Sequence, residues 1–188
     1  MPSFYSHGKL LLSGEYLVLD GACALAIPTK YGQYMHCTST QNGVISWESK
    51  DLNGHTWFAT HITINNSKVT ASNNSQTDKT LCKLFEVIIQ LNPTFKDILR
   101  SGWHIETQLE FPQNWGLGSS ATLVNNLATW AGINPFTLLQ HTLGGSGYDL
   151  ATAVNQQPIF YQLNNKRPVI TTCSFEASHL PHLYFVHL

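Results

Sequence analysis

The sequence predicts an α/β (α+β) fold built on a largely antiparallel sheet. Residues 103–111 alternate between two sets of side chains, as in a strand with one buried and one solvated face. Runs at 31–39, 44–48 and 57–64 are strand-like and are separated by Asn/Gly turns, which favours an antiparallel meander. Apolar residues between 81 and 91 recur instead at helical spacing, so helices must accompany the sheet.

The other elements can be assigned along the chain. Residues 4–29 are apolar with interspersed glycines, which indicates short buried strands and turns around a site. The polar stretch 65–76 is expected to be a loop, after which Thr77 and Asp78 can cap a helix that stops at Pro93. Further helices are expected at 121–130, 135–143 and 148–154, and late strands at 158–163 and 183–188.

Composition limits the classes of partner. The chain has 188 residues, of which 43% are hydrophobic and 11% charged, so it can bury a sizeable core as one globular domain. Its formal net charge is -1 and it has no cluster of Lys and Arg. Nucleic acid and anionic membranes are held by concentrated positive charge, so a small-molecule ligand is favoured over either.

Neither a targeting signal nor a pair of metal-binding or disulfide-bonded cysteines is expected from the sequence. No apolar run approaches the roughly 20 residues that span a bilayer, and the first residues lack the features of a signal peptide, so a cytoplasmic protein is expected. The four cysteines are widely spaced, which favours buried thiols over disulfides or zinc ligands. The sequence gives no oligomeric state.

A glycine-rich loop precedes the apolar helix expected at 121–130. Gly116 and Gly118 allow a tight turn, and Ser119 and Ser120 then open the helix. Unpaired backbone N–H groups and the positive end of the helix dipole form an anion site there, and the small side chains let a phosphate chain approach. A polyphosphate nucleotide is the predicted ligand.

Other known motifs fit this glycine-rich loop less well. The loop is not a Walker A motif, because no Lys follows the glycines. It fits the loose Gly-x-Gly-x-x-Gly/Ala dinucleotide pattern, but the acid expected about 20 residues later and a strand buried on both faces are missing. The Gly-x-Ser-x-Gly elbow of a hydrolase does not occur either. A plain loop and helix cap, without a ligand, stays open as an interpretation.

A single charged residue lies in the long neutral stretch that follows. Between Glu110 and Lys166 the only charged side chain is Asp149, next to the glycine cluster at 144–147. A lone carboxylate in apolar surroundings is costly unless it is paired or used. Asp149 is therefore the first candidate for acid/base chemistry.

Three stretches together resemble the GHMP family of small-molecule kinases. They are HGKLLLSGEYLVLDGACALAIP near the N-terminus, PQNWGLGSSAT at the glycine-rich loop and GGSGYDLATA around Asp149. The resemblance covers nearly the whole chain in order and spacing. The Gly14-Glu15-Tyr16 stretch is more similar to phosphomevalonate kinases than to mevalonate kinases, and Gly147-Tyr148-Asp149-Leu150-Ala151 resembles the GYDIA-type members.

The resemblance implies a fold, an activity and residue roles. The fold is the ribosomal protein S5 domain 2-like N-terminal domain, with helices packed on one side of the sheet, and the activity is ATP-dependent phosphorylation of a metabolite, best matched by the mevalonate/isoprenoid branch. Asp149 and Lys9 would be catalytic, and Glu15, Tyr16, Gly147 and Tyr148 would bind substrate. ATP would be held by the glycine-rich loop and its flanks, namely Trp115, Gly116, Leu117, Gly118, Ser119, Ser120 and Ala121.

The sequence departs from the family pattern in two respects. Residues 1–188 would be the ATP-binding N-terminal domain of a truncated protein, because the family's ferredoxin-like C-terminal domain has no counterpart here. Residues 133–148 contain no acid where many relatives place a Glu, so Mg²⁺ would rest on Ser120, Asp149 and the ATP phosphates. The alternative to a kinase is a degenerate, noncatalytic nucleotide-binding domain, or a structural domain without ligand.

Overall fold

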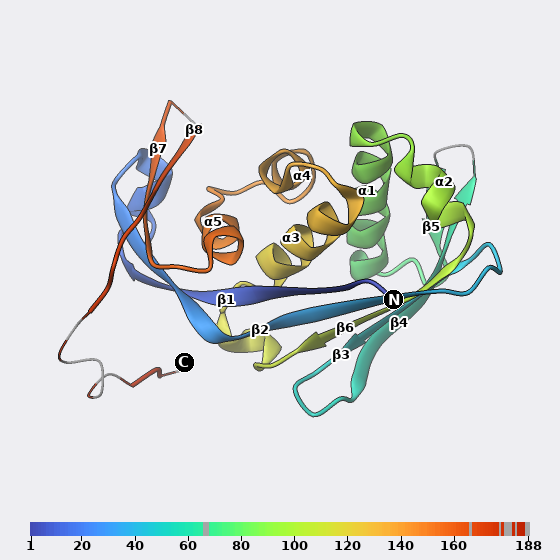
Figure 1. Cartoon of the computed structure of the whole chain (residues 1–188), viewed down its shortest axis with the longest axis horizontal. Coiled ribbons are helices and arrows are strands. Elements are labelled where there is room, and N and C mark those ends of the chain that lie inside the picture. The colour runs from blue at the N-terminus through green and yellow to red at the C-terminus, as the bar shows by residue number, and fades with distance from the viewer. Residues whose placement is uncertain (66–67, 166, 177, 179–181, 183, 187–188) are drawn as a thin grey trace.

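The computed structural model describes residues 1–65, 68–165, 167–176, 178, 182 and 184–186. An eight-stranded mixed sheet carries all five α-helices of the described residues on one face (Figure 1). The strands are β1 (Ser3–Ser13), β2 (Ala24–Ser39), β3 (Ile45–Lys50), β4 (Thr56–Asn65), β5 (Lys68–Ala71), β6 (Trp103–Leu109), β7 (Ile159–Asn164) and β8 (Arg167–Thr172). The α-helices are α1 (Gln76–Leu91), α2 (Phe95–Arg100), α3 (Ser119–Ala131), α4 (Pro135–Thr142) and α5 (Tyr148–Asn155), with short 3₁₀ helices η1 (Leu17–Asp20) and η2 (Gln113–Trp115).

The order of strands corrects the predicted meander. The sheet runs β5-β4-β3-β6-β2-β7-β8, and β1 pairs with the long β2. β6 therefore lies between β2 and β3, antiparallel to the first and parallel to the second. A meander needs consecutive strands to be neighbours, whereas here the chain leaves the sheet through α1 and α2 and returns between two earlier strands. A largely antiparallel sheet with helices on one side is confirmed.

The core lies between the sheet and the helices. In β6 the buried residues are Ile105, Thr107 and Leu109, which alternate with half-buried ones as the sequence predicts. β3 follows the same period, and its Trp47 meets Phe85 of α1 edge-on, with ring centroids 6.1 Å apart. No α-helix of the described residues lies on the opposite face of the sheet (Figure 1).

Several local predictions need correction. β5 lies inside the stretch 65–76 expected to be a loop, and α2 and β8 were not predicted. Residues 3–13 and 24–39 form two long strands with η1 between them, rather than several short strands. The strand expected at 183–188 lies partly outside the described residues, and 184–186 are not in a strand. The helices α3, α4 and α5 and the strand β7 are confirmed to within a few residues.

The N-cap of α1 lies two residues before the predicted Thr77. Ser75, not Thr77, is the N-cap: its hydroxyl accepts a hydrogen bond from the Asp78 backbone N–H at 3.1 Å, and the Asp78 carboxylate accepts one from the Ser75 backbone N–H at 2.7 Å. This reciprocal pair is a capping box. Burial raises the pKa of the Asp78 carboxyl, but hydrogen bonds, chiefly from Ser75, together outweigh it and lower that pKa.

Ser75→Ala is expected to lower the free energy of unfolding by about 1 kcal/mol, because an orphan N–H and a buried carboxylate both lose a partner. Urea unfolding measures the difference, and Ser75→Thr should keep most of the stability. Since the folded-state pKa of Asp78 is lowered, this contribution is present above the ordinary carboxyl pKa and is lost as the pH falls below about 4. An alanine variant with unchanged stability at neutral pH would contradict it.

No helix of the described residues combines the length and the apolar character that crossing a membrane requires.

Candidate active site

Lys9 of β1 and Asp149 of α5 are far apart in the chain, but their side chains meet in the structure. The Lys9 Nζ lies 3.0 Å from Asp149 Oδ1 and donates a hydrogen bond to the Tyr148 hydroxyl at 3.1 Å. The same ammonium sits over the Tyr148 ring, 4.9 Å from its centroid. The two predicted catalytic residues thus form an ion pair, and Tyr148 contacts the cation from the adjacent position.

Burial distinguishes the two charged groups. The Lys9 side chain is 13% exposed, whereas that of Asp149 is 37% exposed. Oδ1 of Asp149 is buried and has the Lys9 ammonium as its ion-pair partner. The exposed part of the carboxylate therefore remains accessible to a ligand, while its buried oxygen is neutralised by the protein.

The pKa values of the group reflect this pairing. Burial lowers the pKa of Lys9, but the charge of Asp149 and the hydrogen bond to Tyr148 outweigh it, and the net pKa is raised. Burial is also the main reason that the pKa of the Tyr148 hydroxyl is raised, and the Lys9 ammonium partly opposes that shift. Lys9 is consequently a cation throughout the neutral pH range.

The glycine-rich loop fixes this pair against the start of α3. The Lys9 backbone N–H donates to the Leu117 carbonyl at 2.9 Å, so β1 and the loop are joined directly beside the ion pair. Gly118 is the N-cap of α3 with φ +86, and a Cβ there would lie 3.3 Å from Lys9 Cγ and 3.9 Å from Asp149 Cβ. Only glycine combines this left-handed backbone with such a close approach.

The first turn of α3 opens into a cavity of about 220 Å³. The first helical bond runs from Thr122 N–H to the Gly118 carbonyl, so the amides of residues 119–121 precede the hydrogen-bonded ladder. Ser119 and Ser120 line the cavity together with residues of β3, β6 and the first turns of α1. The cavity is smaller than the roughly 300–1,000 Å³ of sites that enclose a drug-sized ligand, so it suits a part of one.

Other predicted site residues lie around this centre. Ala121 and Leu117 are buried, and Trp115 packs near Leu109, Phe111 and Leu117, with its ring centroid 5.4 Å from that of Phe185. Gly147 is the N-cap of α5 with φ +83 and lies close to Phe136. Gly116 also has positive φ, with open space around it.

Glu15 and Tyr16 lie in the exposed turn between β1 and η1. Tyr16 is 80% exposed and adopts φ +61, and no described contact ties it to the ion pair. The negative charge of Glu15 acts on Tyr148, as one of the minor influences that raise the tyrosine pKa. Substrate binding by these two residues stays a prediction.

The residues that complete the cavity and the loop were not predicted from the sequence. Gln33 and Trp57 line the cavity from β2 and β4, and Thr77 and Thr80 line it from α1. Gly8 packs so closely that a Cβ would lie 2.9 Å from the Leu117 carbonyl oxygen. Their residue types carry no local signal, because their role comes only from strands and helices that meet in the folded chain.

Comparison with known proteins gives likenesses in structure. No protein-family model and no curated protein sequence matches this chain. Among solved structures, it is similar to mevalonate kinase of Methanococcus jannaschii (TM-score 0.64, 16% identity, 93% of this chain and 56% of that one). It is also similar to D-glycero-D-manno-heptose 1-phosphate kinase of Bacteroides thetaiotaomicron (TM-score 0.68, 16% identity, 93% and 60%).

A further likeness is to phosphomevalonate kinase of Streptococcus pneumoniae, solved with phosphomevalonate and AMPPNP (TM-score 0.57, 20% identity, 86% of this chain and 50% of that one). The chain thus spans between half and three fifths of the length of these enzymes. Identities of 16–20% show a shared fold rather than a shared substrate. On this evidence the chain has the fold of the GHMP small-molecule kinases, the family that its three sequence motifs resemble.

Proposed function

We propose that the chain belongs to the GHMP kinases and transfers the γ-phosphoryl group of ATP to a hydroxyl or phosphate of a small metabolite. The observation that carries the proposal is the Lys9–Asp149 ion pair, held at 3.0 Å against a glycine-rich loop that starts a helix. A helix N-terminus binds phosphate, and a carboxylate beside it can receive a proton from the acceptor. A phosphotransferase site needs both parts, and their proximity supports the proposal.

The positions of the cavity and of the ion pair indicate how ATP would lie along the glycine-rich loop. Ser119 and Ser120 line the cavity at the start of α3, and the preceding residue, Gly118, lies close to Lys9 and Asp149. ATP with its nucleoside toward the cavity would pass its phosphates over the amides of residues 119–121. Its γ-phosphoryl group would then end next to the ion pair, in the place where an acceptor has to attack.

The chemistry follows from the charges of the pair. For a hydroxyl acceptor, Asp149 takes the proton as the acceptor oxygen forms its bond to the γ-phosphorus, and the bond to the bridging oxygen breaks with its electron pair leaving on ADP. Lys9 stays protonated, keeps Asp149 ionised before the reaction and offsets negative charge on the transferred group.

The residues at the site fit a magnesium ion of MgATP. Ser120 stands at the start of α3 at the cavity, and Asp149 presents a carboxylate that is 37% exposed. Mg²⁺ prefers oxygen ligands and is commonly held by one or two carboxylates together with substrate phosphates, so Ser120 and Asp149 would hold it. When bound, the ion supplies neutralisation of the phosphate charge.

The mevalonate/isoprenoid branch is the proposed source of the acceptor. Its support is the similarity of Gly14-Glu15-Tyr16 to phosphomevalonate kinases and the structural likeness to mevalonate and phosphomevalonate kinases. The heptose 1-phosphate kinase has a comparable TM-score, so sugar phosphates belong in the same test.

Release of ADP from MgATP tests the function, with mevalonate, phosphomevalonate, homoserine, galactose and heptose 1-phosphate as acceptors. Acceptor-dependent release supports the kinase and identifies its substrate class. Saturable MgATP binding without release for any acceptor would instead favour the noncatalytic nucleotide-binding domain. Absence of MgATP binding would contradict both.

Tyr148→Phe is expected to lower kcat/KM by roughly 2- to 10-fold, because one hydrogen bond to Lys9 is lost while the ring remains under the ammonium. That hydrogen bond helps to raise the pKa of Lys9, so the alkaline limb of the pH profile should move to lower pH. Tyr184→Phe, which removes a hydroxyl from a side chain that is 85% exposed, is the matched control and should change neither quantity. An unshifted alkaline limb in Tyr148→Phe would argue against this positioning role.

A further inference from the structure

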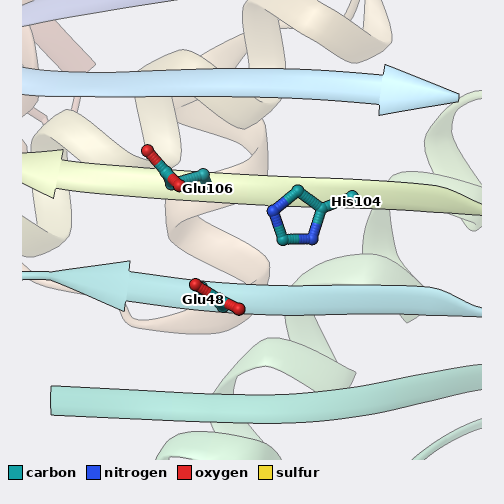
Figure 2. Close-up of side chains that lie close together, drawn as sticks. All are labelled: Glu48, His104 and Glu106. Carbon is teal, nitrogen blue, oxygen red and sulfur yellow. The ribbon is translucent and has the colours of Figure 1, made fainter. Parts of the chain in front are cut away.

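A second group of ligand-type side chains lies on the sheet face opposite the helices. Glu48 of β3 and His104 and Glu106 of β6 alternate with the buried residues Trp47, Ile105 and Thr107, so they point away from the core. β3 and β6 are parallel, and Glu48 is the register partner of Glu106. Figure 2 shows the His104 ring and the two carboxylates gathered over these strands.

The three side chains are close enough to share one ion. One ligand atom from each lies within 4.8 Å of the others, and all three residues are half-buried. Their strands are flanked on both sides by paired neighbours, β4 beyond β3 and β2 beyond β6. The backbone positions of the ligands are thus fixed by hydrogen-bonded ladders rather than by loops, which suits a defined coordination geometry.

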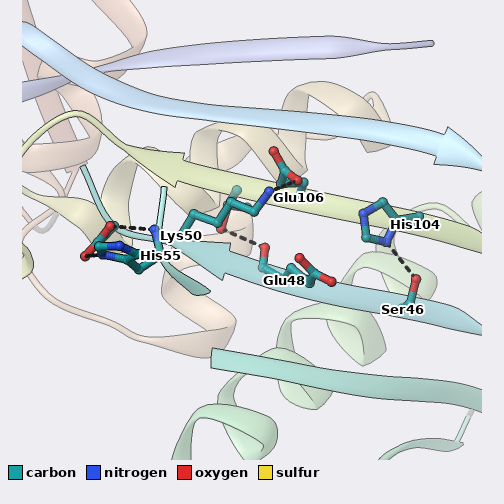
Figure 3. A network of polar contacts seen from close by, with 8 residues as sticks. Ser46, Glu48, Lys50, His55, His104 and Glu106 are labelled. Carbon is teal, nitrogen blue, oxygen red and sulfur yellow. Dashed lines mark hydrogen bonds and ion pairs between the residues drawn. The ribbon is translucent and has the colours of Figure 1, made fainter. Parts of the chain in front are cut away.

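The protein balances the charges of the group only in part. Like charges directly opposite each other on neighbouring strands are unfavourable. Lys50 forms an ion pair with Glu106, and this hydrogen bond is the main reason that the pKa of Lys50 is raised (Figure 3). Within the described residues, the Glu48 carboxylate has no hydrogen bond or ion pair of its own, so a cation at this place would meet an unpaired ligand.

His104 is oriented by a neighbour as metal-ligating histidines commonly are. The Ser46 hydroxyl lies 2.9 Å from His104 Nδ1, and Ser46 is the register partner of His104 (Figure 3). A hydrogen bond at one ring nitrogen fixes the ring and leaves Nε2 available as a ligand. Ser46 would therefore act on the metal through His104 rather than by touching it.

We propose that Glu48, His104 and Glu106 form a divalent transition-metal site, with Zn²⁺ as its best-fitting ion. One imidazole nitrogen and two carboxylate oxygens are ligands that Zn²⁺ accepts at about 2.0–2.2 Å, with water completing four-coordination. Mg²⁺ prefers oxygen-only octahedral shells, so the histidine selects against it. This site is independent of the proposed kinase centre, because Ser49 and Thr107 line the cavity from the opposite face of the same strands.

Removal of the Lys50 charge distinguishes the proposed site from nonspecific binding of Zn²⁺. Its ammonium occupies the Glu106 carboxylate and repels an incoming cation. Removal of that charge should release the carboxylate and tighten Zn²⁺ binding by about 5-fold, the scale of one nearby unit charge in water. Nonspecific binding to surface histidines would not respond in this direction.

Calorimetric titration of the chelator-stripped chain with ZnCl₂ tests the site. One Zn²⁺ per chain is expected, with affinity lowered at least 10-fold in His104→Gln and Glu48→Gln, lowered about 10-fold in Ser46→Ala and raised in Lys50→Met. His141→Gln, an exposed histidine on α4, should bind like the parent. Thermal unfolding without metal verifies that each variant folds, and added Zn²⁺ should raise the Tm of the parent but not that of His104→Gln.

The same titration can overturn the proposal. Absence of saturable Zn²⁺ binding by the folded parent would do so. Equal affinities of His104→Gln, Glu48→Gln and His141→Gln would also do so, because they would assign the binding to other residues.

Discussion

Asp149→Asn is expected to lower kcat by about 100-fold or more, the usual scale for removal of a general base. Asparagine keeps the shape of the side chain but cannot take the acceptor proton, and it no longer forms an ion pair with Lys9. The affinity for MgATP should change little, because the loop amides supply most of the phosphate contacts in the proposed arrangement and asparagine keeps an oxygen that can face Mg²⁺. Steady-state ADP release and a separate nucleotide titration measure the two quantities.

The control for this variant is Asp20→Asn. Asp20 is an exposed carboxylate of η1, so its loss removes the same charge from the chain without touching the site. It should retain the kcat of the parent. If Asp149→Asn keeps the turnover of the parent, the assignment of Asp149 as the base is wrong. A large loss of MgATP affinity in that variant would instead assign Asp149 to nucleotide binding.

Gly8→Ala is expected to lower kcat by about 10- to 100-fold, although residue 8 carries no chemistry. A Cβ there would lie 2.7 Å from Thr29 Oγ1, 2.9 Å from the Leu117 carbonyl oxygen and 3.1 Å from the Tyr31 carbonyl oxygen. Two of these atoms are backbone, so β1 has to move away from the glycine-rich loop. The next residue is Lys9, whose N–H bond to Leu117 at 2.9 Å would lengthen and displace the ion pair.

The same substitution should also lower the free energy of unfolding by about 1–3 kcal/mol, the usual cost of overpacking. Gly54→Ala separates stability from site geometry. Gly54 has φ +81 in the turn between β3 and β4 and nothing within 4 Å of an added Cβ, so alanine there strains only the backbone. It should lose stability and keep its turnover. A Gly8→Ala chain that turns over like the parent would contradict the close packing of loop and strand.

Some features of the site could be predicted from short stretches of sequence. Gly116 and Gly118 do take left-handed φ values, and α3 begins at Ser119 directly after them. Asp149 stands out because it is the only charge between Glu110 and Lys166. Each of these signals is local, since it depends on backbone preferences or on composition within a few residues.

Other features depended on interactions that no local pattern contains. The alternation in 103–111 predicts a strand with two unlike faces, but it does not say that β6 inserts between β2 and β3. The sequence predicts a cap at Thr77 and Asp78, which are favoured capping residues, whereas the reciprocal bonds between Ser75 and Asp78 place the N-cap at Ser75. The short strands β5 and β8 form because β4 and β7 offer them a free edge.

The sequence by itself determined the period of each long element, the glycine turns and the identity of the one carboxylate in the neutral stretch, because these are properties of neighbouring residues. The family resemblance implies that Lys9 and Asp149 share a site, but only the tertiary structure gives their contact and places Glu48 beside His104 and Glu106. Both meetings join residues far apart in the chain, and strand order and register set them. Those are fixed by burial of one shared core, to which every element contributes and which no single segment encodes.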